Sequence, residues 1–247
     1  MNISTRERVR WALLLWCSLS ISSLRRVNIN LDSPSTEVIR PWIRGREVKR
    51  WHLDWEGLYV LFTRRGIDID AYPAVRDHLL NFKTRLMPGV PGGRKPGTYQ
   101  WFEIQDAIDY HEEFAKPKIV FQEIATYQAF AFSRQPVLCN NKCFFIPRDD
   151  LYLLAILNSK AAWFFLGNVA SKLQGGAFAM QSPFVGQIPV PFVDTLQQTR
   201  AAKIAEKLVN AGAAHTQDAM LEQELNALVY ELYELTEDEI AIVEGRA

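Results

Sequence analysis

The sequence is poor in the residues that build disulfide frameworks and metal centres. Its 247 residues include three cysteines, Cys17, Cys139 and Cys143, and four scattered histidines. Three cysteines do not make a disulfide framework in a chain of this length, which favours the reducing cytoplasm. Cys139 and Cys143 have no second Cys or His pair close by to complete a tetrahedral zinc site. We therefore expect a cytoplasmic protein without a metal.

Common signatures of enzymes are also missing. The chain contains no Gly-x-Gly-x-x-Gly, no Walker-type Gly-Lys-Ser/Thr and no Gly-x-Ser-x-Gly. Neither nucleotide cradling nor a nucleophile elbow is therefore indicated. The acidic residues Asp106, Asp109, Glu112 and Glu113 are spaced like one face of a helix, and we interpret them as a solvated face. No catalytic residue is predicted.

The apolar run from Trp11 to Leu24 is too short for an ordinary transmembrane helix. It follows an Arg-rich start and so resembles a signal peptide, but no clear small-x-small cleavage site follows, and Arg25-Arg26 closes the run. We interpret the run as a buried segment or as the ragged start of a truncated reading frame. Secretion is the alternative, and no membrane partner is expected.

Charge is unevenly distributed although the net charge is zero. Residues 1–100 contain 17 Lys and Arg against 9 Asp and Glu, whereas residues 101–247 contain 11 against 19. A basic half beside an acidic half is typical of a protein with one polyanion-binding face. The alternative is that solvated faces happen to differ.

Apolar runs rich in β-branched and aromatic residues predict short strands. These strands lie at 57–62, 118–125, 129–132 and 143–146. Helical periodicity predicts one helix at 72–86 and another from an N-cap at Asp149 or Asp150 to about Leu166. Because strands and helices mix without βαβ regularity, we expect an α+β fold with a small mixed or antiparallel sheet and flanking helices.

The rest of the chain is punctuated by prolines and ends in helices. Residues 88–97 (PGVPGGRKPG) predict a loop, and 183–192 predict an extended segment. Asp194 is the predicted N-cap of a helical C-terminal segment. Thr236 and Glu239 form a predicted capping box for a last short helix.

Two basic segments carry the main functional signal. The first interleaves two tryptophans with five cations, Arg40, Arg44, Arg46, Lys49 and Arg50. The second is the Gly/Pro loop with Arg94 and Lys95. Lys and Arg neutralise phosphates, and Arg can also pair with guanine edges, so both segments suit DNA. The alternative is a tryptophan core with solubilising arginines.

Five sequence blocks occur in a fixed order. They are IRPWIRGREVKRW (39–51), AYPAVRDHLLNFKTRL (71–86), WFEIQDAIDYHEEFAKPKIVFQEIA (101–125), LYLLAILNSKAAWFFL (151–166) and QIPVP (187–191). Together they resemble the TaqI-like C-terminal specificity domain of adenine-specific DNA methyltransferases and single-chain restriction-modification enzymes. The ending VYELYELTEDEIAIVEG (229–245) is similar too.

In that family a separate Rossmann-like domain binds S-adenosylmethionine, and its Asn-Pro-Pro-Tyr/Phe motif holds the flipped adenine. No Asn-Pro-Pro occurs in this sequence. The resemblance therefore implies a target-recognition part without its catalyst and without a cofactor of its own. The implied partners are double-stranded DNA and a methyltransferase catalytic domain or subunit, with or without a nuclease.

The resemblance also divides the chain into expected parts. Residues 1–36 match poorly and suggest a truncated or split gene, 37–193 form the DNA-recognition domain, and 194–247 form a helical segment packed on it. The expected DNA-binding residues are Arg44, Arg46, Lys49, Arg50, Lys83, Arg94, Lys95, Lys116, Lys118, Asn140, Asn141, Lys172 and Gln174.

Within this set, the cations at 44–50 are expected to position phosphates, and Arg94, Lys95 and the segment 172–174 are candidates for reading bases. Two other functions remain open. One is a protein-interaction scaffold, suggested by the acidic C-terminal helices, and the other is a complete enzyme with an unrecognised site.

Overall fold

The computed structural model describes residues 34–212 and 218–246. Its helices are α1 (Pro73–Leu80), α2 (Lys83–Leu86), α3 (Leu151–Leu157), α4 (Lys160–Val169), α5 (Ser182–Val185), α6 (Thr195–Ala211), α7 (Asp218–Leu232) and α8 (Glu237–Val243). Its strands are β1 (Ile39–Ile43), β2 (Tyr59–Leu61), β3 (Lys118–Gln122), β4 (Ile124–Ala125), β5 (Phe130–Ser133), β6 (Leu138–Cys139), β7 (Cys143–Ile146) and β8 (Phe178–Ala179). The mixture confirms the α+β class.

Short 3-10 helices connect these elements. They are η2 (Pro34–Val38), η3 (Gly45–Glu47), η4 (Ile69–Ala71), η5 (His111–Ala115) and η6 (Gln174–Gly176).

The expectations for the apolar run Trp11–Leu24 and for Cys17 lie outside the described residues.

The strands form three small sheets. In the first, β1 lies between antiparallel β2 and parallel β6, and in the second, β3 lies between antiparallel β5 and β7. A third, two-stranded sheet pairs β4 with β8. The central strand β3 is buried along most of its length, which fits its apolar residues Ile119, Val120 and Phe121. The sheets are therefore small and mixed or antiparallel, as predicted.

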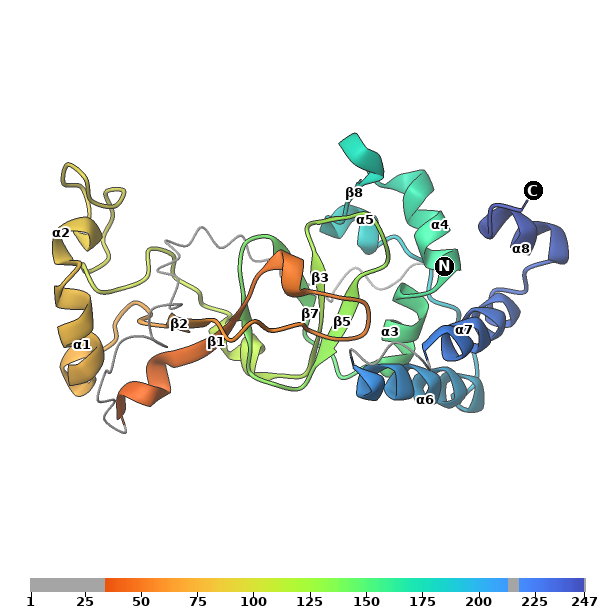
Figure 1. Cartoon of the computed structure of the whole chain (residues 1–247), viewed down its shortest axis with the longest axis horizontal. Helices are drawn as coiled ribbons and strands as arrows, with labels where there is room; N and C mark the ends of the chain where they lie inside the picture. Colours follow the sequence, from red (N-terminus) through yellow and green to blue (C-terminus); the bar gives the residue numbers. More distant parts are fainter. Residues whose placement is uncertain (1–33, 213–217, 247) are drawn as a thin grey trace.

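The molecule is elongated, with α1 and α2 at one end, the two three-stranded sheets in the middle and the helices α3 to α8 at the other end (Figure 1). Three apolar cores follow this order. The smallest lies around Val75 and Leu79, and the second lies around Ile43 and Phe145. The largest joins the sheet residue Phe121 to helix residues of both the middle and the end of the chain.

Local capping signals are confirmed where the sequence contains them. The side chains of Asp150, Asp194 and Thr236 accept hydrogen bonds from the backbone three residues on and begin α3, α6 and α8. Thr236 and Glu239 complete the predicted capping box. These ends depend on neighbouring residues alone.

Four predictions of regular structure are wrong in detail. The helix expected at 72–86 breaks after Leu80, and the helix expected at 151–166 breaks at Asn158 and Ser159. Ser159 caps the second piece through its hydroxyl. The segment expected to be extended from Pro183 begins as α5, because proline suits the first turn of a helix.

The fourth correction concerns the acidic run at 106–113, which is a loop followed by the 3-10 helix η5 rather than one face of an α-helix. Strands β1, β6 and β8 were not predicted. Each is short, and β6 and β8 have two residues each, too few to show an alternating pattern.

Candidate nucleic-acid interface

The first basic segment is largely neutralised by nearby carboxylates. Arg44 Nη2 lies 3.0 Å from Glu47 Oε1 and 2.6 Å from Glu56 Oε2, and Arg46 Nη2 lies 2.9 Å from the same Glu56 oxygen. The hydrogen bond from Arg44 lowers the pKa of the Glu56 carboxyl. Lys49 is half-exposed and has no side-chain hydrogen bond or ion pair within the described residues. Lys49, like the exposed Arg40, is therefore available to a partner.

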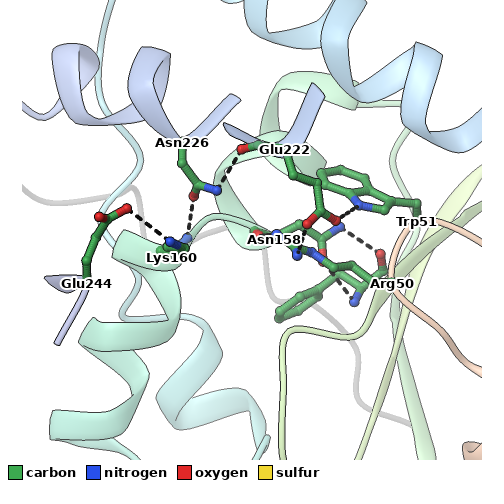
Figure 2. A network of polar contacts seen from close by, with 8 residues as sticks. Arg50, Trp51, Asn158, Lys160, Glu222, Asn226 and Glu244 are labelled. Atoms are coloured by element: carbon green, nitrogen blue, oxygen red, sulfur yellow. Dashed lines mark hydrogen bonds and ion pairs between the residues drawn. The ribbon is translucent and has the colours of Figure 1, made fainter. Parts of the chain in front are cut away.

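Arg50 lies inside a polar network rather than on the surface (Figure 2). Its Nη1 lies 2.7 Å from Glu222 Oε2, and its Nη2 donates to the Asn158 carbonyl oxygen at 2.6 Å. The neighbouring indole of Trp51 donates to the other Glu222 oxygen at 3.0 Å. Burial lowers the pKa of Arg50, and the charge of Glu222 opposes that shift. The expectation that Arg50 contacts phosphate is therefore corrected: its charge is used internally.

The same network continues into the C-terminal helices. The Asn226 amide oxygen accepts from the Lys160 backbone at 2.8 Å, and its nitrogen donates to the Glu222 carbonyl at 2.7 Å. The Lys160 ammonium lies 3.0 Å from Glu244 Oε1. Figure 2 shows these contacts bridging α4, α7 and α8. The network thus fixes the first basic segment to the helical end of the molecule.

In the second basic segment, the Arg94 side chain holds its loop together through hydrogen bonds. Its guanidinium donates to the carbonyl oxygens of Leu86 (2.8 Å), Glu103 (2.8 Å), Gln100 (3.2 Å) and Trp101 (2.9 Å). It also lies over a tyrosine ring, 4.6 Å from the centroid. A side chain with four carbonyl partners does not extend into a groove. This corrects the expectation that Arg94 reads a base.

Exposed lysines surround this locked arginine. Lys95 is its exposed chain neighbour, and Lys83 lies on α2 with its ammonium 5.2 Å from the Trp101 ring centroid. Neither ammonium forms an ion pair with a carboxylate within the described residues. Lys83 and Lys95 therefore present two cations beside the loop that Arg94 organises.

The two lysines before and in β3 differ sharply. Lys116 is exposed and forms an ion pair with Glu113 at 2.7 Å. Lys118 is fully buried, and its ammonium donates to the carbonyl oxygens of Phe114, Lys116 and Gln135. Burial lowers the pKa of Lys118 to about 8. The expectation that Lys118 contacts DNA is therefore corrected, because no phosphate can reach it.

Asn140 and Asn141 form the turn between β6 and β7. The Asn140 side chain accepts from the Lys142 backbone at 3.1 Å, so it shapes the turn, while Asn141 is half-exposed. Gly45 packs against this turn so closely that a Cβ would come within 3.1 Å of the Lys142 carbonyl oxygen. The structure thus brings the first basic segment and the asparagine turn together.

Lys172 and Gln174 are exposed on a hairpin that carries η6. This hairpin lies at the other end of the molecule from α2 and its loop (Figure 1). No ion pair or side-chain hydrogen bond holds either residue within the described parts of the chain. Both are therefore available to a partner.

The sequence reasoning missed several exposed groups. Arg64 is an exposed cation before α1, and Ile124 is an exposed apolar residue of β4 in the third sheet. One sequence signal was available: residues 151–193 contain no Asp or Glu. A stretch of 43 residues without a carboxylate is compatible with a polyanion nearby.

Two further features bear on what the described residues can do. No group of His, Cys, Asp or Glu that could hold a metal ion is found among residues 34–212 and 218–246, and none of their helices is long and apolar enough to cross a membrane. An apolar hollow of about 510 Å³ lies between α4 and α8, where Phe165, Val169, Tyr233 and Ile242 contribute to its lining.

Comparison with known proteins identifies the fold and the family. The type IIL restriction-modification enzyme MmeI, whose structure is a complex with DNA, is similar to 84% of this chain with a TM-score of 0.57 and 16% sequence identity. The chain spans 30% of the MmeI chain. No curated protein matches it. The model of the TaqI-like C-terminal specificity domain matches residues 40–190, well over half of the sequence. The chain belongs to the family of TaqI-like C-terminal specificity domains.

Proposed function

We propose that the chain binds double-stranded DNA and supplies the choice of target sequence to a restriction-modification enzyme. The observation that carries this proposal is the family match over residues 40–190. The similarity to MmeI supports it, since that enzyme was solved with DNA. The exposed, unneutralised lysines described above supply the cations that any phosphate contact requires.

These lysines suggest which surface faces DNA. In Figure 1 the loop after α2 and the hairpin tip before β8 project from the upper long edge of the molecule, and the short helix after β1 lies between them, nearer the middle of the molecule. Lys95 lies in the loop and Lys172 in the hairpin tip. A duplex lying along this edge would contact the loop and the hairpin tip. Lysines would fix its register, and the projecting turns would approach base edges.

The catalytic step belongs to another domain or subunit in this proposal. We infer from the family match that this partner is an adenine-specific methyltransferase, which binds S-adenosylmethionine and acts in the cytoplasm. The apolar hollow between α4 and α8, beside the acidic residue Glu239, is the surface best suited to such a protein partner. The hollow also favours the second candidate function, a protein-interaction scaffold.

A selection experiment tests the proposed function. The purified full chain is mixed with a random duplex pool at low salt, and bound molecules are recovered and sequenced over several rounds. We expect one short motif to be enriched, with an affinity that falls as salt rises. The same chain alone is expected to transfer no labelled methyl group to DNA.

Binding without enrichment would leave a DNA-binding protein that does not choose sequence. Failure to bind any duplex, together with capture of a methyltransferase subunit, would favour the scaffold. Methyl transfer by the chain alone would show the complete enzyme that the proposal excludes.

A further inference from the structure

The tip at residues 171–177 is part of a three-stranded ribbon. Ile124 pairs with Ala179 in β4 and β8, and Lys172 pairs with Phe178 in the hairpin. Because side chains alternate along each strand, Ile124 and Leu173 lie on one face of the ribbon, and Lys172 and Phe178 lie on the other. The ribbon therefore has one aliphatic face and one face with a cation and an aromatic ring.

The ribbon is anchored to the helical end through its aromatic face. The Phe178 ring lies 4.8 Å from the Trp163 ring of α4. The ring also packs over Gly167 of the same helix, where a Cβ would be in ordinary van der Waals contact with it at 3.4 Å. The hairpin backbone closes with hydrogen bonds from Leu173 to Ala177 (2.8 Å) and from Ala179 to Ser171 (3.0 Å). The base of the hairpin is thus held in place by its contact with α4 and by its own backbone hydrogen bonds.

The turn itself requires glycine. Gly175 and Gly176 both have φ of +74°, a region that disfavours other residues. A Cβ at either position would meet nothing within 4 Å, so conformation rather than crowding explains the pair. The tip stands clear of the rest of the described chain and leaves room for a partner.

The side chains beside the turn combine an apolar group with two polar ones. Leu173 is 40% exposed, and its neighbours Lys172 and Gln174 are exposed too. Ile124, on the same face, is 48% exposed. The hairpin and its flanks lie within the 43 residues without a carboxylate. A negatively charged partner with apolar layers fits this surface, whereas an acidic or neutral protein would not explain the missing carboxylates.

From this arrangement we propose that the tip is a wedge that inserts Leu173 against the stacked bases of bound duplex DNA. This inference rests on the proposed function and names how one part of the surface acts. Lys172 neutralises a phosphate beside the insertion, and Gln174 faces base edges. Leucine wedges of this kind partly unstack a base step and bend the duplex.

Fluorescence of 2-aminopurine tests the wedge. The base is placed in turn at each position of the duplex that the full chain selects, and fluorescence is measured with and without protein. We expect a rise at one step, because an unstacked 2-aminopurine is brighter. Leu173→Ala should abolish the rise and weaken binding about tenfold, as expected for the loss of one buried apolar side chain.

Two matched variants separate the wedge from other roles. Leu196→Ala removes a leucine that is 78% exposed on α6 and should change neither signal nor affinity. Lys172→Gln should lower the log–log salt slope by about one while the fluorescence rise remains. Leu173→Ala should leave the salt slope unchanged, because leucine carries no charge. Circular dichroism and urea unfolding confirm that each variant is folded.

Failure of the wedge and failure of the proposed function differ in outcome. Binding of the selected duplex without a fluorescence rise at any step would overturn the wedge alone. The wedge is also overturned if Leu173→Ala binds the duplex with wild-type affinity and gives the wild-type fluorescence rise. If that variant also fails to capture the catalytic subunit, the tip is a protein contact. Failure to bind any duplex would overturn the proposed function and the wedge together.

Discussion

The two basic segments both concentrate cations, but the structure gives their arginines different kinds of partner. Arg44 and Arg46 are held by carboxylates of Glu47 and Glu56, whereas Arg94 is held by backbone carbonyls. A carboxylate cancels the charge that it binds, but a carbonyl orients a guanidinium and leaves its net charge in place. The density of cations in a sequence therefore does not give the potential of a surface. The kind of partner decides it.

The largest effect is expected from the part-buried ion pair of Arg50 and Glu222. Arg50→Ala leaves the Glu222 carboxylate uncompensated and the Asn158 carbonyl unpaired, so the free energy of unfolding should fall by about 3 kcal/mol. The salt slope of DNA binding should stay unchanged, since Arg50 is not available to phosphate. Urea unfolding and binding at two salt concentrations measure the two quantities.

The control is Arg46→Ala, which removes an exposed arginine and should change stability little. The double variant Arg50→Ala/Glu222→Ala should cost less than the sum of the single ones, because neither charge is then left alone. Additive losses, or a lower salt slope for Arg50→Ala, would contradict the internal role.

The second largest effect is expected from Arg94, whose guanidinium holds its loop together. Arg94→Ala removes the donor that four carbonyls share and should cost about 2 kcal/mol of stability. Limited proteolysis should then cut within residues 88–97, and DNA binding should weaken to the same extent on every duplex. Lys95→Ala is the matched control and should leave the loop resistant. A loss confined to the selected sequence would instead identify Arg94 as a base reader.

Buried Lys118 predicts a pH effect. Its pKa of about 8 in the folded chain is below the ordinary value of 10.5, so the folded state binds fewer protons between these values and this contribution to stability rises with pH. The unfolding free energy of wild type minus that of Lys118→Met should grow by about 2 kcal/mol from pH 7.5 to 9.5. Lys116→Met, an exposed control, should show no such trend. A flat difference for Lys118→Met would show that its ammonium is not desolvated.

A smaller effect is expected from the lysines around Trp101. Lys83→Ala and Lys95→Ala should each lower the log–log salt slope of DNA binding by about one and leave stability unchanged. Lys116→Ala, whose ammonium is already paired with Glu113, serves as the control. If all three variants behave alike, ion pairing does not decide which cations reach phosphate.

The smallest effect is expected when a carboxylate that pairs with surface arginines is removed. Glu56→Ala removes the carboxylate that pairs with Arg46 and one of the two carboxylates that pair with Arg44. Because these pairs lie on an exposed surface, DNA should bind about two- to fourfold more tightly at low salt. The gain should disappear at high salt. Asp77→Ala removes a carboxylate that holds Arg76 and serves as a second test site. If neither variant changes the affinity for DNA, Arg46 and Arg76 both lie away from bound DNA.

Features that depend on adjacent residues could be predicted from the sequence. Asp150, Asp194 and Thr236 each begin a helix with a side chain that bonds three residues on, so the signal is contained in a few letters. The break of the helix expected at 151–166 could not be predicted. The Asn158 amide pairs with both backbone groups of Phe130, 28 residues earlier, and that contact exists only in the folded chain.

The candidate site shows the same limit. The sequence correctly grouped cations into two segments, but the partner of Arg50 is 172 residues away, and Lys118 is held by backbone carbonyls on both sides of it in the chain, at Phe114, Lys116 and Gln135. Residue type and spacing carry no information on such partners. Exposure of Lys95 and Lys172, by contrast, follows from Gly/Pro-rich turns that the sequence shows plainly.

The left-handed backbone of Trp51 has a consequence for how the chain is made. Its φ is +73°, its backbone bridges to β5, and its indole is fixed by Glu222 on α7. A non-glycine residue keeps this conformation only when its surroundings impose it. During synthesis at 5–20 residues per second, roughly ten to thirty seconds separate the emergence of Trp51 from that of its acceptor. The fixing of Arg50 and Trp51 therefore waits for α7, and a chain interrupted before this helix would lack the carboxylate that holds both side chains.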